Sequence, residues 1–196
     1  MKLSLPEGDF GAYIFDCDGT LADTMPLHYK AWCAALREHD LEFPEAMFYQ
    51  LGGVPTVRIV ELLNERHGHA MPPVETARQK EELYLQMLSQ IGPIDPVVAI
   101  AREMHGRLPM AVASGGHRAI VRQTLDALGI TALFDAIIGA EDYENGKPSP
   151  DPFLVAAERL GIEPARCLVF EDTQLGIDAA AAAGMKWVLV PPAPKP

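Results

Sequence analysis

Cysteine is scarce in this chain, and its few positions follow no pattern of a metal site or a disulfide framework. Three cysteines, Cys17, Cys33 and Cys167, lie far apart among 196 residues, and no Cys-x-x-Cys spacing occurs. A zinc site or a set of disulfides is therefore not indicated. Cys17 and Cys167 adjoin expected strands, so we expect them to pack as small apolar residues.

Positive charge is also scarce. The chain has 16 Lys and Arg against 27 Asp and Glu, which gives a formal net charge of −11. This balance argues against nucleic acid as a partner, because nucleic-acid binding needs a basic surface. The overall field also repels an anionic substrate. A phosphate site in this protein must therefore be locally basic.

Long apolar runs are missing as well. No run approaches the ~20 residues that cross a bilayer, and residues 1–7 contain no apolar segment of signal-peptide length. We therefore expect a cytoplasmic protein with no membrane partner. The hydrophobic fraction of 48% is ordinary for a globular protein, and the length allows one domain with a substantial insertion.

What the chain does contain is a pair of acids directly after a short apolar run. Ala12–Phe15 reads as a buried strand, and Asp16, Asp18 and Gly19 follow it in a tight turn. In a parallel α/β sheet, ligands bind at this end of a strand. Two acids there can hold a hard divalent cation, or one can attack a phosphoryl group. A calcium loop would need Glu where Leu27 stands, whereas a glycosyltransferase metal loop stays possible from these residues alone.

Short apolar strands alternate with helices of about ten residues in the second half of the chain. These strands show no polar alternation, which is typical of strands buried on both faces. The pattern therefore predicts an α/β fold with a doubly wound, Rossmann-like parallel sheet. The expected helices span residues 95–105, 117–128, 151–160 and 174–183, and the expected strands span 109–113, 136–139, 167–170 and 187–190.

Between the first strand and this alternating region, the apolar periodicity is helical. Helices are expected over residues 26–40, 56–67 and 74–90, and no strand pattern separates them. We therefore expect a small helical-bundle cap inserted after the first strand. The predicted domains are a core of residues 1–22 and 91–196 and a cap of residues 23–90, with hinges at 22–24 and 91–93.

Polar groups follow the other predicted strands, and a doubly wound sheet brings such loops into one crevice. They are Ser114, Gly115 and Gly116, then Lys147, then Glu171 and Asp172. Each group alone has an ordinary explanation as a turn, a solvated lysine or a helix cap. Together they suit phosphoryl transfer, because a hydroxyl and amides bind phosphate oxygens and a lysine neutralises their charge. Asp16, Asp18 and Asp172 offer the oxygen ligands that Mg²⁺ prefers.

These motifs resemble those of the haloacid dehalogenase-like hydrolase superfamily. The signatures are Asp16-Cys17-Asp18-Gly19-Thr20, Ser114, Lys147-Pro148 and Glu171-Asp172, followed by Gly176 and Ala182-Ala183-Gly184. They span nearly the whole chain. The insertion is similar to the small cap of the β-phosphoglucomutase-like branch. Within that branch, residues 15–21, 28–32 and 51–56 resemble sugar-phosphate phosphatases of the fructose-1-phosphate phosphatase kind.

The resemblance implies a Mg²⁺-dependent reaction through an aspartyl-phosphate. Asp16 would be the nucleophile, and Asp18 would protonate the leaving oxygen and then activate water. Mg²⁺ would be held by Asp16, the backbone carbonyl of Asp18 and Asp172, with Glu171 as a further ligand or close by. Ser114, Gly115 and Lys147 would bind the phosphoryl group. Because Asp18 must be protonated as the leaving group departs, its pKa is expected to be raised.

Further candidates come from the insertion and from the ends of the loops. His28 matches a family position that links cap and core, and Thr20 resembles the residue that orients the acidic loop. Arg58 and Lys80 are cations expected to face the substrate, although a solvated helix face explains such residues equally well. His117, at the start of a helix, is a further candidate for phosphate contact.

The function expected from these residues is hydrolysis of a small sugar phosphate by a phosphatase. The alternative is a β-phosphoglucomutase-type sugar phosphomutase, which would pass the phosphoryl group to a sugar hydroxyl instead of water. A non-catalytic phosphate-binding protein is disfavoured because nucleophile, acid, lysine and metal ligands are all present. We expect a small phosphorylated substrate as the partner, and a monomer or weak homodimer.

Overall fold

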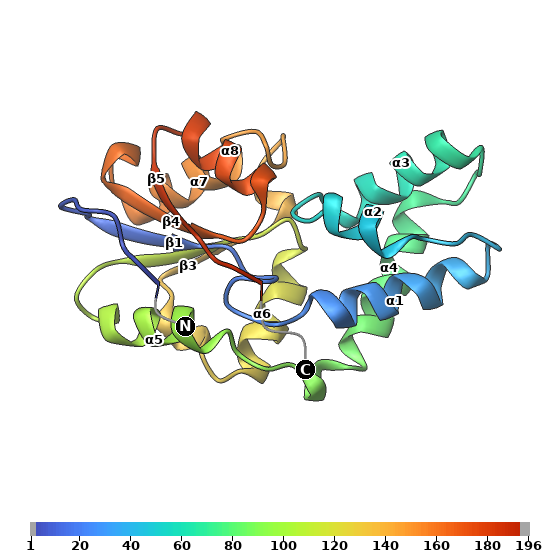
Figure 1. The fold of residues 1–196 in the computed structure, drawn as a ribbon, viewed down its shortest axis with the longest axis horizontal. Coiled ribbons are helices and arrows are strands. Elements are labelled where there is room, and N and C mark those ends of the chain that lie inside the picture. Colours follow the sequence, from blue (N-terminus) through green and yellow to red (C-terminus); the bar gives the residue numbers. More distant parts are fainter. Residues whose placement is uncertain (1–2, 193–196) are drawn as a thin grey trace.

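A computed structural model of the protein describes residues 3–192 and contains one five-stranded parallel sheet (Figure 1). The strand order is β3-β2-β1-β4-β5, which confirms the doubly wound α/β fold. Residues 1–2 and 193–196, which belong to the predicted core domain, lie outside the described residues. The strands are β1 (Ala12–Phe15), β2 (Met110–Ala113), β3 (Ala136–Ile138), β4 (Cys167–Glu171) and β5 (Lys186–Leu189).

Helices cover both faces of the sheet, so its central strands are buried on both sides. Tyr13 and Phe15 of β1 pack into one apolar cluster with α5 (Asp95–Met104) and α6 (Arg118–Ala127). The alternate residues of β1, Ala12 and Ile14, pack into a second cluster with α7 (Asp151–Leu160) and α8 (Gln174–Ala182). This burial explains why the strands read as continuous apolar runs.

The strand register carries the acidic loop to the carboxyl edge of the sheet. Phe15 pairs with Phe170 of β4 and with Val112 of β2. The Asp16 amide continues the ladder by donating to the Phe170 carbonyl at 2.9 Å. The loops after β1, β2 and β4 therefore begin side by side, as expected of ligand-binding loops at this end of the strands.

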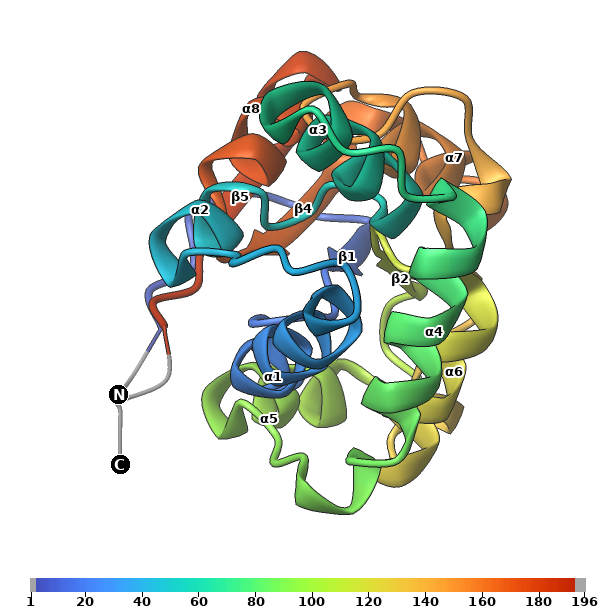
Figure 2. The same ribbon diagram turned by 90° about the vertical axis from the view of Figure 1, so that its right-hand side faces the viewer.

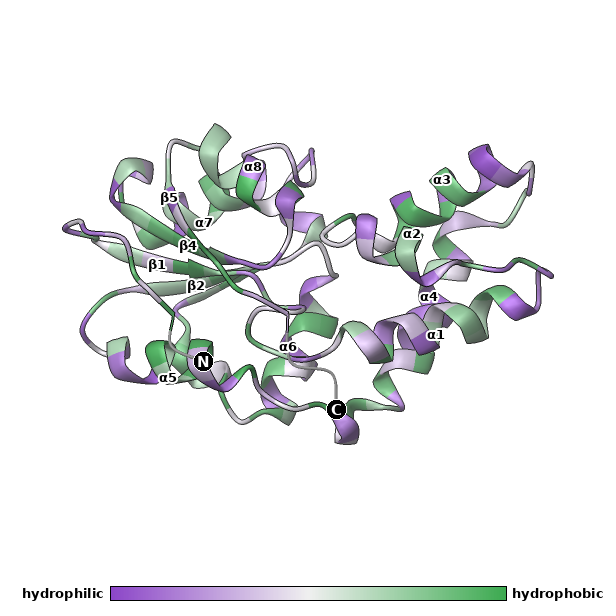
Figure 3. Ribbon diagram, viewed as in Figure 1, coloured by the Kyte–Doolittle hydropathy of each residue, from purple (hydrophilic) through white to green (hydrophobic). Residues whose placement is uncertain are grey.

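The first four helices after β1 lie beyond this edge of the sheet (Figures 1 and 2). They are α1 (Met25–Arg37), α2 (Glu45–Gln50), α3 (Thr56–His67) and α4 (Pro73–Leu85). They have an apolar cluster of their own, with Trp32 and Leu63 fully buried, while their outer sides are largely hydrophilic (Figure 3). We call residues 23–90 the cap, and the division into two domains stays a prediction.

The helices of the cap differ from the prediction in two places. The expected helix over 74–90 is divided into α4 and a 3₁₀ turn, η1 (Leu88–Gln90). The short helix α2 begins after Pro44 and was not predicted, because six residues are too few to reveal a helical period. Three further 3₁₀ turns occur in the core: η2 (Thr131–Leu133), η3 (Ala140–Asp142) and η4 (Pro164–Arg166).

Two chain crossings connect the cap to the core, and they lie against each other. The Asp23 amide donates to the Gly92 carbonyl at 2.9 Å, and Ala22 forms an antiparallel bridge with Pro93. The predicted hinges at 22–24 and 91–93 are thus one paired structure. Within residues 3–192, no helix is both long and apolar enough to cross a membrane.

Candidate active site

Lys147 connects the carboxyl ends of β1 and β4 through a buried ionic network. Its Nζ donates to Asp16 Oδ1 at 2.7 Å and to Glu171 Oε1 at 2.6 Å. The lysine side chain is fully buried. Burial opposes its charge, but the two carboxylates outweigh burial and hold the pKa of Lys147 above its usual range. The lysine therefore stays an ammonium and fixes the Asp16 carboxylate in one position.

Glu171 is held in turn by the start of α8. Its Oε2 accepts from the Thr173 amide at 2.6 Å and from the Thr173 hydroxyl at 2.8 Å. The Thr173 hydroxyl also caps α8 by accepting from the Gly176 amide. A Cβ at position 176 would lie 1.9 Å from Glu171 Oε1, which explains the glycine there. Both Glu171 oxygens already accept hydrogen bonds, so this residue positions Lys147.

Asp172 completes an acidic cluster that fits a divalent cation. Asp16, Glu171 and Asp172 offer oxygens within 4.8 Å of one another, and Lys147 is the one ammonium paired with them in the described chain. Burial is the main reason why the pKa of Asp16 is raised well above its usual value and that of Asp172 to about 7. When all three carboxyl groups are ionised, they exceed the one ammonium by two negative charges, which Mg²⁺ would balance with its preferred oxygen ligands.

Thr20 contacts this cluster from the acidic loop. Its hydroxyl is buried and donates to Asp172 Oδ1 at 3.2 Å. This bond joins the loop after β1 to the loop after β4. Thr20 therefore orients Asp172, and its contacts are with the core instead of the cap.

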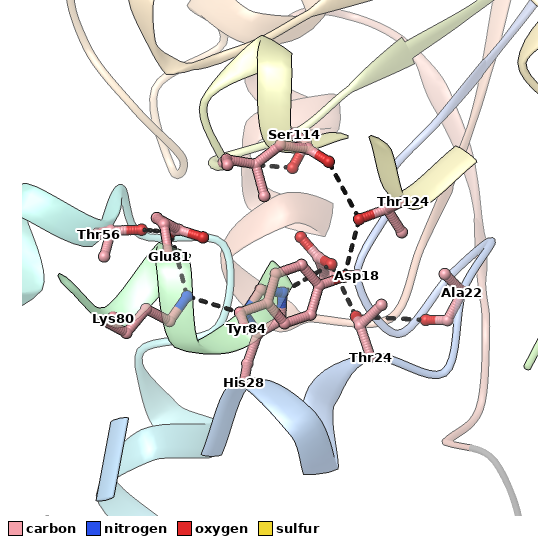
Figure 4. Close-up of polar contacts among 12 residues, drawn as sticks. Asp18, Ala22, Thr24, His28, Thr56, Lys80, Glu81, Tyr84, Ser114 and Thr124 are labelled. Carbon is pink, nitrogen blue, oxygen red and sulfur yellow. Dashed lines mark hydrogen bonds and ion pairs between the residues drawn. The ribbon is translucent and has the colours of Figure 1, made fainter. Parts of the chain in front are cut away.

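Asp18 turns away from the lysine network and faces the cap. Its Oδ1 accepts from the Thr24 hydroxyl at 2.7 Å and from His28 Nε2 at 3.0 Å. Lys80 Nζ lies 2.8 Å from His28 Nδ1, and the His28 ring stacks on Tyr84 (Figure 4). An ammonium can only donate, so Nδ1 must be the acceptor and Nε2 carries the proton donated to Asp18. The cap thus delivers a hydrogen-bond donor to the second acid of the loop.

These cap contacts shift the pKa of Asp18 in the direction opposite to the expected one. Burial opposes its charge, but His28, Thr24 and Lys80 together outweigh burial and hold the pKa of Asp18 below its usual range. The prediction of a raised pKa for this carboxyl is therefore wrong for the structure described here. The reason is that two hydrogen-bond donors, His28 and Thr24, and the positive charge of Lys80 come from the cap, whereas the sequence suggested only acidic neighbours.

The loop after β2 brings Ser114 and Gly115 opposite the cap. The Ser114 hydroxyl accepts from the Gly116 amide at 3.0 Å, and its own proton remains free to donate. A Cβ on Gly115 would lie 2.4 Å from the Gly53 carbonyl of the cap. Core and cap backbones therefore meet here without room for a side chain. Asp16, Asp18, Ser114, Gly115, His28 and Lys80 all line one cleft.

Two predicted cations are not brought into this cleft. Arg58 lies on the exposed side of α3, where it pairs with Glu61 at 2.9 Å and Glu65 at 3.1 Å. His117 is also largely exposed, with Nδ1 3.4 Å from Glu141. Neither side chain lines the cleft. In the sequence, Arg58 and Lys80 were equally good candidates for a cation that faces the substrate. The packing of α3 and α4 places Lys80 in the cleft and Arg58 outside it.

Several residues that touch the site were missed in the sequence. Thr24 was predicted only as part of a hinge. Tyr84 follows Lys80 by four residues, so the sequence placed the two side chains on the same face of a helix and could have indicated a shared site. The Tyr84 hydroxyl lies 2.8 Å from the Thr124 hydroxyl of α6. Thr56 and Glu81 also line the cleft. Thr56 ends the motif of residues 51–56 but was not singled out, and no motif drew attention to Glu81.

The contact between Gly115 and Gly53 makes a substitution informative. In Gly115→Ala, the added methyl group would overlap the Gly53 carbonyl, so the cap cannot approach the core as closely. We expect kcat/KM to fall at least about tenfold, because a misplacement of about 1 Å in a site is costly. Thermal unfolding should change little, since opening the cap relieves the overlap. Gly11→Ala is the matched control, because its Cβ meets only side-chain atoms at 3.3 Å or more and it does not line the cleft; equal losses in both variants would contradict this explanation.

The sequence pattern of the haloacid dehalogenase-like hydrolases matches residues 10–184 of this chain. The chain belongs to this family. The Escherichia coli relative fructose-1-phosphate phosphatase YqaB is 41% identical over 177 residues, which cover 90% of this chain and 94% of the relative. The family resemblance and the phosphatase expectation drawn from the sequence are thereby confirmed.

Relatives named as mutases are more distant. The β-phosphoglucomutase of Bacillus subtilis is 31% identical over 89% of this chain and 80% of the relative. A crystal structure of the β-phosphoglucomutase of Clostridium difficile superposes with a TM-score of 0.81 at 26% identity, covering 91% of this chain and 83% of that one. This haloacid dehalogenase-like hydrolase is therefore a phosphatase with a β-phosphoglucomutase-like fold, and the mutase alternative has less support.

Proposed function

We propose that the protein is a Mg²⁺-dependent phosphatase that hydrolyses a small sugar phosphate, with fructose 1-phosphate as the first substrate to test. The observation that carries the proposal is the separation of the two acids of the loop. Asp16 is held by Lys147 at 2.7 Å, whereas Asp18 is held by Thr24 and His28. Two carboxylates two residues apart thus have different partners and can take different roles.

In the proposed first step, an Asp16 oxygen attacks phosphorus while the bond from phosphorus to the leaving oxygen breaks. The leaving oxygen takes a proton from Asp18, which must have bound that proton from solvent before the step, because its contacts in the cap hold it ionised until then. In the second step, Asp18 accepts a proton from water as that water attacks the aspartyl-phosphate, which releases phosphate and frees Asp16. The donors that keep Asp18 ionised favour the second step, because a general base must be deprotonated.

We further propose that Asp16, Asp172 and the Asp18 carbonyl would hold Mg²⁺. The metal, when bound, would supply positive charge for the phosphoryl oxygens and the acidic cluster. Direct binding of Mg²⁺ by Glu171 stays a prediction. Both of its oxygens already accept hydrogen bonds in this structure. Ser114, the amide of Gly115 and Lys147 would bind the transferred phosphoryl group.

The test measures both phosphate release and sugar products. With Mg²⁺ present, the protein should release inorganic phosphate from fructose 1-phosphate, and a chelator should remove that activity until Mg²⁺ is restored. A second assay supplies β-glucose 1-phosphate with a trace of glucose 1,6-bisphosphate. Formation of glucose 6-phosphate without free phosphate would replace the phosphatase proposal by the mutase. Turnover that survives complete metal removal would reject the proposed Mg²⁺ site.

The location and the partners of the protein are proposed from its composition. A cytoplasmic location is consistent with the apolar segments of the chain, and a small phosphorylated substrate is the proposed partner. A monomer or weak homodimer stays a prediction, which sedimentation measurements would test.

A further inference from the structure

Glu81 of α4 carries a buried carboxylate oxygen without a hydrogen-bond donor. Its Oε1 accepts from the Thr56 hydroxyl at 2.7 Å and from Lys80 Nζ at 3.1 Å. Its Oε2 is fully buried and has no partner among the described residues. Buried carboxylate oxygens are nearly always hydrogen-bonded, because an unpaired one loses the water it would otherwise bind. The orphaned oxygen therefore needs a donor from outside the chain.

The position of Glu81 indicates where that donor comes from. Glu81 lines the same cleft as Asp16, Asp18 and Ser114, but it belongs to the cap. Figure 4 shows one of its oxygens meeting Thr56 and the other directed away from that contact. A phosphoryl group on Asp16 would lie on the core side of the cleft, so the rest of the substrate would extend towards the cap and Glu81.

We propose that Glu81 determines specificity by accepting a hydrogen bond from a hydroxyl group of the substrate and by repelling a second anionic group. The substrate class is then a phosphate monoester of a neutral polyhydroxyl compound. This inference rests on the proposed phosphatase function and adds to it the group that selects the leaving alcohol.

The basic residues of the cleft support the exclusion of a second anion. Lys80 and His28 are the basic side chains lining the cap side of the cleft in the described chain. Lys80 already contacts Glu81 and His28, and His28 contacts Asp18. His28 has no further N–H to offer, and Lys80 has one N–H left beyond these two contacts, so the cap side has little capacity to pair with a second phosphate. A bisphosphate would instead place its extra negative charge near the Glu81 carboxylate, which is unfavourable in a poorly solvated site.

Glu81→Gln tests this role with little change in shape. Thr56 and Lys80 are both donors, so they should keep the carbonyl oxygen of Gln at the Oε1 position. The amide NH₂ then replaces Oε2, which turns an acceptor into a donor and removes the negative charge. The assay compares kcat/KM for fructose 1-phosphate, fructose 1,6-bisphosphate and 4-nitrophenyl phosphate, of which the last has no sugar hydroxyl.

In Glu81→Gln, we expect kcat/KM for fructose 1-phosphate to fall about 10- to 100-fold relative to 4-nitrophenyl phosphate, the range for one hydrogen bond to a charged group. The ratio of bisphosphate to monophosphate turnover should rise. The control is Glu82→Gln, because Glu82 is exposed and pairs with Arg78 on the same helix. Unchanged ratios in Glu81→Gln, or equal changes in both variants, would overturn the inference. If the unmodified protein hydrolyses none of the three esters, the proposed function itself fails.

Discussion

Replacing Asp16 by Asn is expected to abolish Mg²⁺-dependent release of phosphate, with kcat lowered by at least about 10⁴-fold. The amide has nearly the same shape and can still accept from Lys147, so the fold around β1 should persist. What is lost is the carboxylate oxygen that we propose as the nucleophile, because an amide does not attack phosphorus. The measurement is phosphate release from 4-nitrophenyl phosphate and fructose 1-phosphate at saturating Mg²⁺.

A matched variant separates this effect from a general loss of acidic charge. Asp178 on α8 is exposed and accepts only from Gln174 at 2.8 Å, so Asp178→Asn should keep full activity. Both variants should unfold at temperatures close to that of the unmodified protein. If Asp16→Asn keeps more than a small fraction of activity, another residue is the nucleophile.

Replacing Lys147 by Met is expected to affect both stability and activity. It leaves Asp16 and Glu171 as buried carboxylates without their ammonium, and breaking a buried ion pair in this way costs about 3–5 kcal/mol. If Lys147 binds the transferred phosphoryl group as proposed, its loss should also lower kcat by about 10²- to 10³-fold. Urea unfolding gives the first quantity, and steady-state kinetics gives the second.

Two further variants test the cause of this loss. Lys186→Met removes an exposed lysine of β5 that donates to the Glu7 carbonyl, and it should be nearly neutral in both measurements. Glu171→Gln added to Lys147→Met should recover part of the lost stability, since it removes one of the two unpaired charges. No recovery in the double variant would argue that Lys147 acts mainly through its packing on the Phe153 ring, whose centre is 5.0 Å away.

The core was predictable from the sequence because its signals are local. Each strand is a short apolar run, and α7 and α8 end close to the glycines that indicated their ends, Gly161 and Gly184. The helix over 56–67 agrees with α3 at both ends. Such elements need only neighbouring residues to specify them. The six-residue α2 was missed because it is too short to show a helical period. It is stabilised by tertiary contacts such as the burial of Phe48.

The core side of the site was also predictable, whereas the cap side was not. Asp16, Ser114, Lys147 and Asp172 all follow strands, so knowledge of the sheet was enough to bring them together. On the cap, the same reasoning could not separate Lys80, which contacts His28, from Arg58, which pairs with its own helix. Which side of a cap helix faces the core depends on how four helices pack on one another.

The sequence by itself determined the parallel sheet and the loops that carry the acids, because strand burial and residue order are enough to specify them. The phosphatase expectation came from the resemblance of its motifs to a known family. Only the tertiary structure decided the contacts of Asp18 and left one carboxylate oxygen of Glu81 unpaired. The pKa of Asp18 is lowered by His28 and Thr24. Oε2 of Glu81 is unpaired because Thr56 and Lys80 both donate to Oε1. Both depend on distances between cap and core, and those distances arise only when the two parts pack together.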